Sequence, residues 1–278
     1  MDTTTIRIPA TSANLGPGFD CLGVALALYH HVSLRRGTPP APDPMVMEAA
    51  AAYFRASGKG SFDFGWSIDG DIPRSRGLGS SVAVRLGVLH GLNELDERPL
   101  DSETIYRLCA ELEGHPDNAA PAAFGGFAVA RPDHVYFRCE VAPELRFVLL
   151  IPDAEMDTGS SRAQLPATLG RSEAVRSTAH AALITAAFAS QQYRLLRGSF
   201  CDWLHQPFRE MANPHLRPAV DAATAAGALG GYLSGSGSAV CAVTLDAADH
   251  VARAMQSVLP SARVLVLEAD NRGVTTAV

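Results

Sequence analysis

Lysine is almost absent from this chain of 278 residues, in which Lys59 is the only one. A Walker A phosphate loop places a lysine directly after its last glycine, so the chain holds no such loop. A dinucleotide-binding fingerprint is excluded too, because it requires a third glycine where Val82 stands. Any phosphate bound here must therefore be neutralised by backbone amides, arginine side chains and a metal ion.

Other features that the chain lacks exclude further classes of protein. The net charge is −6, whereas nucleic-acid-binding surfaces are usually basic, so we expect no nucleic-acid partner. The chain has no run of 18 apolar residues, so we expect no membrane span. The N-terminus lacks the charged and apolar regions of a signal peptide. The five cysteines are scattered and form no CxxC pair, which favours a reduced, cytoplasmic protein. A hydrophobic content of 47% allows a substantial core.

The most informative segment that is present reads GLGSSV, from Gly77 to Val82, and a helical pattern follows it at once. Glycines let a loop present its backbone N–H groups, and a helix N-terminus adds free N–H groups and a positive dipole end. The serine hydroxyls can donate hydrogen bonds or bind a divalent cation. The segment therefore predicts a phosphate cradle. The alternative interpretation is a glycine turn before an ordinary helix.

The order of elements predicts a mixed α+β fold rather than a doubly wound sheet, because strands and helices do not alternate regularly. We expect strands over 5–9, 22–34, 62–68, 126–130, 134–141, 147–152 and 263–269, with two more beside residues 234–238. Helices are expected over 45–57, from the phosphate loop to about 95, over 103–113, and briefly before residue 125. Others are expected over 172–197, 200–212, 216–226 and 247–258. A boundary near 141–146 would divide two halves that share a cleft.

Four motifs in order resemble those of the GHMP kinase superfamily. They are TSANLGPGFD at 11–20, RGLGSSVA at 76–83, EGHPDNAAPAAFGG at 113–126 and GGYLSGSGSAV at 230–240. The third of them is similar to the homoserine kinases within that superfamily. The resemblance implies a ribosomal-S5-like domain over 1–145, with the phosphate loop, and a ferredoxin-like domain over 146–278. It also implies a homodimer that transfers a phosphoryl group from MgATP to L-homoserine, giving O-phosphohomoserine for threonine synthesis.

Phosphoryl transfer requires mainly positioning and charge stabilisation, which assigns roles to the residues of the phosphate loop. Ser81 and Glu113 offer the hard oxygen ligands that Mg²⁺ prefers. The alternative for Glu113 is an exposed carboxylate at a helix end. By resemblance, the nucleotide-binding residues are Pro73, Arg76, Gly77, Leu78, Gly79, Ser80 and Ser81.

An amino-acid acceptor requires an anion for its ammonium group and an arginine for its carboxylate. Asp20 or Asp117 can meet the ammonium or the hydroxyl, and Arg162 and Arg209 can bind the carboxylate. Alternatively, each arginine is a surface residue and His115 caps a turn. By resemblance, the substrate-binding residues are Asn14, Asp20, His115, Asp117, Thr158, Arg162, Arg209 and Gly235, and those that act in catalysis are Ser81, Asn118 and Arg162.

Asn118 stands in a region where sugar and mevalonate kinases of this superfamily look to an aspartate as the base. An amide cannot accept a proton at neutral pH. We therefore expect direct in-line attack by the acceptor hydroxyl, whose proton leaves late, to the γ-phosphate. A loose transition state tolerates this, because the nucleophile is little bonded when the charge shifts.

Several positions depart from the family pattern, mostly on the nucleotide side. Pro44 precedes Met45 where an asparagine is usual, Gly70 and Asp71 replace a basic residue, Val82 replaces alanine, and Ser238 replaces proline. Two alternative functions stay open. One is a kinase for another small hydroxy amino acid, such as threonine, and the other is a pseudokinase that binds an amino acid without catalysis. Glu113, Ser80 and Ser81 argue against the second.

Overall fold

Long antiparallel strands form the first sheet in a computed structural model that describes residues 2–39, 41–156 and 158–277. Strand β1 (Thr3–Ala13) is rich in the β-branched residues that favour strands, and it pairs with β2 (Leu22–Arg36). The sheet runs β10–β1–β2–β4–β5, with β3 also paired to β2. The remaining strands are β3 (Phe64–Gly70), β4 (Phe127–Ala130), β5 (Tyr136–Cys139) and β10 (Thr275–Ala277).

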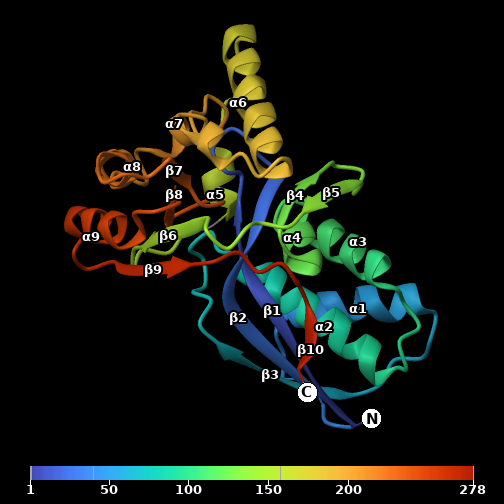
Figure 1. The fold of residues 1–278 in the computed structure, drawn as a ribbon. Coiled ribbons are helices and arrows are strands. Elements are labelled where there is room, and N and C mark those ends of the chain that lie inside the picture. Colours follow the sequence, from blue (N-terminus) through green and yellow to red (C-terminus); the bar gives the residue numbers. More distant parts are fainter. Residues whose placement is uncertain (1, 40, 157, 278) are drawn as a thin grey trace.

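Four helices pack together beside this sheet (Figure 1). They are α1 (Pro44–Ser57), α2 (Ser80–Leu95), α3 (Ser102–Glu113) and α4 (Ala119–Phe124). Asp43 caps α1 by accepting hydrogen bonds from two backbone N–H groups, and Pro44 occupies the first helical position. Helix α2 lies directly on β1 and β2, so its N-terminus faces the end of the loop that joins them.

The second sheet has the order β7–β8–β6–β9 and is fully antiparallel. Its strands are β6 (Arg146–Ile151), β7 (Gly230–Leu233), β8 (Val240–Thr244) and β9 (Arg263–Leu267). Helices α8 (Leu216–Ala225) and α9 (Ala248–Val258) pack on it. The chain order, in which helices follow β6 and β8, is the βαββαβ arrangement of ferredoxin-like folds.

Strand β6 joins the cores of the two halves. Phe147 and Leu149 pack in the larger core, which also holds the first sheet, whereas Val148 and Leu150 pack in a second core under α8 and α9. This division follows from the alternation of side chains along a strand. A stacked pair, Phe127 and Phe188, with ring centroids 4.2 Å apart, adds a contact between the halves.

Two helices of the C-terminal half differ from the sequence prediction. The helix expected over 172–197 ends early: α6 (Arg171–Ala189) is followed by the 3₁₀ turn η1 (Tyr193–Leu196), because Gln191 adopts a positive φ of 55°. The helix expected over 200–212 is reduced to α7 (Gln206–Arg209). Here the Asp202 carboxylate accepts hydrogen bonds from the N–H groups of Leu204, His205 and Gln206, which holds a turn.

Two elements were not predicted at all. One is α5 (Thr158–Ala163), and the other is β10, which returns to the first sheet and pairs with β1. The division of the chain at residues 145 and 146 stays a prediction. None of the helices in the described ranges is both long and apolar enough to cross a membrane.

Candidate functional site

A cleft of about 780 Å³ lies where the four motifs meet. Its walls come from the β1–β2 loop, the phosphate loop, the end of α3, the loop before α4, and the loop between β7 and β8. Most of the predicted site residues line it: Asn14, Asp20, Gly77, Leu78, Gly79, Ser80, Ser81, Glu113, His115, Asp117, Asn118, Arg162, Arg209 and Gly235. Tertiary folding thus brings together segments that are more than 200 residues apart in the sequence. For example, the side-chain amide of Asn14 donates a hydrogen bond of 2.9 Å to the carbonyl oxygen of Gly235.

The phosphate loop is held tightly between two other motifs. A β-carbon at Gly77 would lie 2.0 Å from the carbonyl oxygen of Ser234, and its φ is +75°. The hydroxyl of Ser234 donates to the carbonyl oxygen of Gly77 over 2.7 Å. The backbone N–H of Thr11 donates to the carbonyl oxygen of Leu78 over 3.2 Å. Because no side chain caps the N-terminus of α2, its first N–H groups are available to an anion.

Glu113 and Ser81 form a polar cluster beside this N-terminus. The Ser81 hydroxyl donates to Oε2 of Glu113 over 2.9 Å, while Arg85 forms an ion pair with Oε1. Arg85 also pairs with Glu48 on α1, over 2.8 Å. The Glu113 side chain is only 8% exposed, so it is not the exposed helix-end carboxylate of the alternative interpretation. A carboxylate oxygen and a hydroxyl at hydrogen-bond distance fit the donor set that Mg²⁺ prefers.

The loop before α4 directs Asp117 and His115 into the cleft. Nδ1 of His115 lies 2.7 Å from Oδ1 of Asp117, which also accepts from the backbone N–H of Asn118 over 2.9 Å. Burial alone would lower the pKa of His115, but the hydrogen bond and the charge of Asp117 outweigh it and raise that pKa. Thr11 donates its hydroxyl proton to the side-chain oxygen of Asn118 over 2.7 Å, which fixes the amide.

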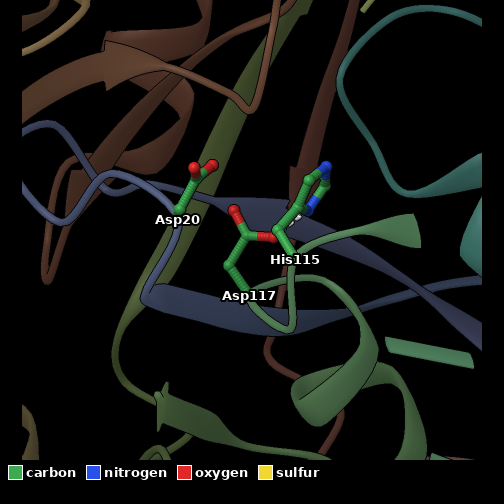
Figure 2. Close-up of side chains that lie close together, drawn as sticks. All are labelled: Asp20, His115 and Asp117. Atoms are coloured by element: carbon green, nitrogen blue, oxygen red, sulfur yellow. Dashed lines mark hydrogen bonds and ion pairs between the residues drawn. The ribbon is translucent and has the colours of Figure 1, made fainter. Parts of the chain in front are cut away.

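Asp20, His115 and Asp117 approach one another from two loops (Figure 2). One ligand atom from each lies within 4.8 Å of the other two. Both oxygens of Asp20 accept hydrogen bonds of 2.8 Å from Arg162, so its charge is already balanced. The second oxygen of Asp117 points toward Asp20 and away from His115. A carboxylate oxygen that faces the cleft in this way can accept from a ligand cation.

Arg209 is a buried cation near this carboxylate pair. It is 2% exposed and donates to His205 Nδ1 and the Gly235 carbonyl oxygen, each over 3.1 Å. Within the described part of the chain, no carboxylate forms an ion pair with it. Burial, and then repulsion from Arg162, lower the pKa of Arg209 to about 10, so it stays protonated at neutral pH. A buried guanidinium without an anionic partner is suited to bind a carboxylate ligand.

Comparisons with known proteins agree with this geometry. The family model described as GHMP kinases N terminal domain matches residues 44–126, and that described as GHMP kinases C terminal matches residues 173–261. The chain belongs to the GHMP kinase family. This confirms the family resemblance and the two-domain α+β fold that it implies.

Within this family, relatives named homoserine kinase cover nearly all of the chain. One from Deinococcus radiodurans is 39% identical over 254 residues, which span 85% of this chain and 82% of that protein. One from Clostridium botulinum (strain Alaska E43 / Type E3) is 34% identical over 290 residues, 96% of each chain. The crystal structure of homoserine kinase from Cytophaga hutchinsonii matches with a TM-score of 0.92 at 25% identity, over 100% of this chain and 98% of that chain.

Two residues that the resemblance suggests, Arg76 and Pro73, do not line the cleft. Arg76 turns away and donates to the carbonyl oxygen of Pro152 over 2.9 Å, and it pairs with Glu155 at 3.2 Å. Pro73 lies outside the cleft as well. Thr158 begins α5, but its side chain lies outside the described part of the structure. Asn14 reaches the cleft, yet its amide is used to join Asp20 N–H and Gly235 O.

The departures from the family pattern have identifiable places in this GHMP kinase. Pro44 starts α1, and Gly70 lines the cleft with a φ of +137°. Ser238 is buried, and its hydroxyl donates to the carbonyl oxygen of Ala154.

Among the residues that sequence reasoning missed are Arg85 and Phe19, which line the cleft, and His205, which contacts Arg209. Arg85 stands four residues after Ser81, and His205 four before Arg209, and residues at that spacing share a helix face. This spacing could have indicated Arg85 and His205 from the sequence.

Proposed function

We propose that this chain is an ATP-dependent kinase that phosphorylates the side-chain hydroxyl of L-homoserine and yields O-phospho-L-homoserine. The observation that carries the proposal is the placement of Arg209 and Asp117 in the cleft that also holds the phosphate loop: Arg209 is buried and forms no ion pair with a carboxylate of the described residues. Such a pair of opposite charges can orient the carboxylate and ammonium groups of an amino acid. Relatives named homoserine kinase, matched over most of the chain, support the choice of acceptor.

The residues of the cleft have separate roles in this proposal. The loop from Gly77 to Ser81 and the N-terminus of α2 bind the β- and γ-phosphates of ATP. Ser81 and Glu113 hold Mg²⁺, which would supply positive charge that balances the phosphates. Asp117 receives the ammonium group, and Arg209, with Arg162 beside it, receives the carboxylate.

Asn118 lies next to the carboxylate site but cannot act as a base. Its side-chain oxygen accepts from Thr11, and its Nδ2 donates to Oδ1 of Asp117 over 3.3 Å, so both ends of the amide are held beside the cleft. The acceptor hydroxyl therefore attacks the γ-phosphate directly and passes its proton to the phosphoryl oxygens. A loose transition state makes this possible, because little charge builds up on the nucleophile before transfer.

We also propose a homodimer in the cytoplasm. Helix α6 projects from the body of the molecule (Figure 1). One face of it leaves apolar side chains exposed, with Val175 at 62% and Leu183 at 41%. A second copy would cover this face. All five cysteines are free, which fits a reducing compartment.

A coupled assay of ADP release tests the function. With MgATP, we expect the highest kcat/KM for L-homoserine among homoserine, threonine, serine and mevalonate. The Arg209→Leu variant should raise KM for homoserine while KM for ATP stays unchanged, because truncating one side of a buried charge contact typically costs about 2–5 kcal/mol. Arg217→Leu is a matched control, since Arg217 is 72% exposed and pairs with Glu210.

Three outcomes would contradict the proposal. Preference for threonine or serine would change the acceptor, and preference for mevalonate would remove the amino-acid site. Absence of turnover with every acceptor, in a folded protein, would favour a pseudokinase. If both KM values rise together in Arg209→Leu, the arginine acts on folding or domain closure and does not bind the carboxylate.

A further inference from the structure

His205 is a fully buried histidine behind the acceptor end of the cleft, in the turn before α7. Both of its ring nitrogens are occupied. Nε2 lies 2.8 Å from the carbonyl oxygen of Gly16, in the β1–β2 loop, and Nδ1 lies 3.1 Å from Nη1 of Arg209. The ring therefore connects the loop that carries Asp20 with the guanidinium of Arg209, which has no ion pair among the described residues.

The chemistry of the two neighbours determines the state of the ring. A carbonyl oxygen only accepts, so Nε2 must carry the proton that it donates to Gly16. A guanidinium only donates, so Nδ1 must present its lone pair to Arg209. The imidazole is then neutral and has one defined tautomer. Burial lowers the pKa of His205, and the charge of Arg209 lowers it further against the opposing charge of Asp202.

The surroundings hold this ring in place from every side. Asp202 accepts from the backbone N–H of His205 over 3.0 Å, and one of its oxygens lies 3.4 Å from Nε2. Phe19 stacks on the ring with centroids 5.2 Å apart, and the guanidinium of Arg209 lies 5.4 Å from the centre of the same Phe19 ring. The charged groups that face His205 are therefore Asp202, Arg209 and, through its field, Asp20.

We propose that His205 is a positioning residue for the acceptor site: as a neutral acceptor it orients the guanidinium of Arg209 toward the substrate carboxylate. The inference rests on the proposed function, because Arg209 is the group that would receive that carboxylate. Without the acceptor at Nδ1, Arg209 would lose one of the contacts that fix its plane. A guanidinium binds a carboxylate best when its orientation is already set, so a loss of orientation weakens acceptor binding.

Two amide variants separate the two nitrogens of the ring. The amide of asparagine occupies the position of Nδ1, so His205→Asn keeps an acceptor for Arg209 and loses the donor to Gly16. The amide of glutamine reaches the position of Nε2, so His205→Gln keeps the donor and loses the acceptor. We expect His205→Gln to raise KM for the amino-acid acceptor about tenfold or more, the effect of one hydrogen bond to a charged group.

His205→Asn should keep the acceptor KM within a few-fold of the wild type, and KM for ATP should be unchanged in both variants. Equal acceptor KM values in the two variants, or a rise of both KM values together, would overturn the proposal in favour of a merely structural role. KM is read with whichever acceptor the wild type uses best. A wild type without turnover would therefore contradict the proposed function rather than the role of His205.

A measurement on the wild type keeps the inference testable if neither variant folds. In ¹⁵N-labelled protein, the ring nitrogens of His205 should report a neutral imidazole with its proton on Nε2 at pH 7 and at pH 6. A charged ring at pH 7, or a proton on Nδ1, would overturn the proposal, because Arg209 would then face a donor. This result does not depend on catalysis and stands apart from the kinetic test.

Discussion

Asp117 and Asn118 are adjacent residues with different chemistry at the acceptor end of the cleft. Oδ1 of Asp117 accepts from His115 and from the backbone of Asn118, so this oxygen is engaged by the protein. The other oxygen points toward Asp20, on the side where we place the ammonium group (Figure 2). Asp117 is thus arranged as a counter-charge for a ligand cation.

The substitution Asp117→Asn distinguishes two roles of Asp117, that of a counter-charge for the ammonium group and that of a catalytic base. We expect KM for homoserine to rise at least tenfold with a smaller change in kcat, because the ammonium group loses its anion. Steady-state kinetics with each substrate varied in turn measures both constants, and Asp133→Asn, at an exposed carboxylate paired with Arg131, is the control. The opposite pattern, an intact KM with kcat abolished, would identify Asp117 as the base.

Helix α2 and its loop form the phosphate site that we propose, and they contain no lysine. The helix supplies free N–H groups, and Ser81 on its first turn hydrogen-bonds to Glu113 on α3. Arg85, one turn further, balances the buried charge of Glu113 and reaches Glu48 on α1. The positive charge that a Walker loop takes from lysine is here distributed over backbone dipoles and, in our proposal, a metal ion.

Gly77 and Gly58 form a matched pair for testing the packing of this loop. Both have a positive φ, +75° and +66°, but only Gly77 has no room for a β-carbon, since nothing lies within 4 Å of one at Gly58. Gly58→Ala should therefore lower the free energy of unfolding by about 1–2 kcal/mol, the cost of the left-handed conformation. Gly77→Ala should lower it further and raise KM for ATP, because Ser234 must move.

Denaturant unfolding and ATP kinetics measure both effects. Equal losses of stability in the two variants would mean that the loop relaxes freely, and an unchanged KM for ATP in Gly77→Ala would separate the loop from the phosphate site. The contact between Gly77 and Ser234 also links the two halves, since the loops belong to different sheets. The same substitution therefore reports on how rigidly the cleft is assembled.

The two halves of the molecule are joined through strand β6 and share one cleft. Strand β6 packs into both cores, and β10 leaves the C-terminal half to pair with β1. The groups that we propose for acceptor binding come from both sides, Asp117 from the first half and Arg209 from the second. The site is complete only when the whole chain has folded.

At the scale of the whole molecule, helix α6 exposes an apolar face. Ala179, Ala182 and Ala186 lie at helical spacing with the exposed Val175 and Leu183. If a second copy covers this face, the double variant Val175→Glu and Leu183→Glu should sediment as a monomer. Ala174→Glu, exposed on another side of α6, should keep the wild-type mass. A monomeric wild type, or a dimeric double variant, would contradict the proposed dimer.

The local chemistry of the chain was sufficient to predict much of this protein. Glycine conformation, helix capping and the period of apolar residues act over a few neighbours, so α1, α2, α3 and the turn at residues 77–79 follow from their own segments. The motifs, taken in order, indicated the family. Where the secondary structure of a segment depends on distant partners, the prediction was wrong or missed the element, as with α6, α7 and β10.

Only the tertiary structure decided which charges meet. Arg85 pairs with Glu113 across 28 residues of sequence, and Arg162 with Asp20 across 142. Arg209 pairs with no carboxylate in the described part of the chain and contacts His205, while Arg76, from the phosphate motif, donates to the carbonyl oxygen of Pro152. The sequence alone does not show whether an arginine binds a ligand, a carboxylate of the protein or a backbone carbonyl oxygen. The choice depends on burial and on the groups brought within hydrogen-bond distance, and both are properties of the folded chain.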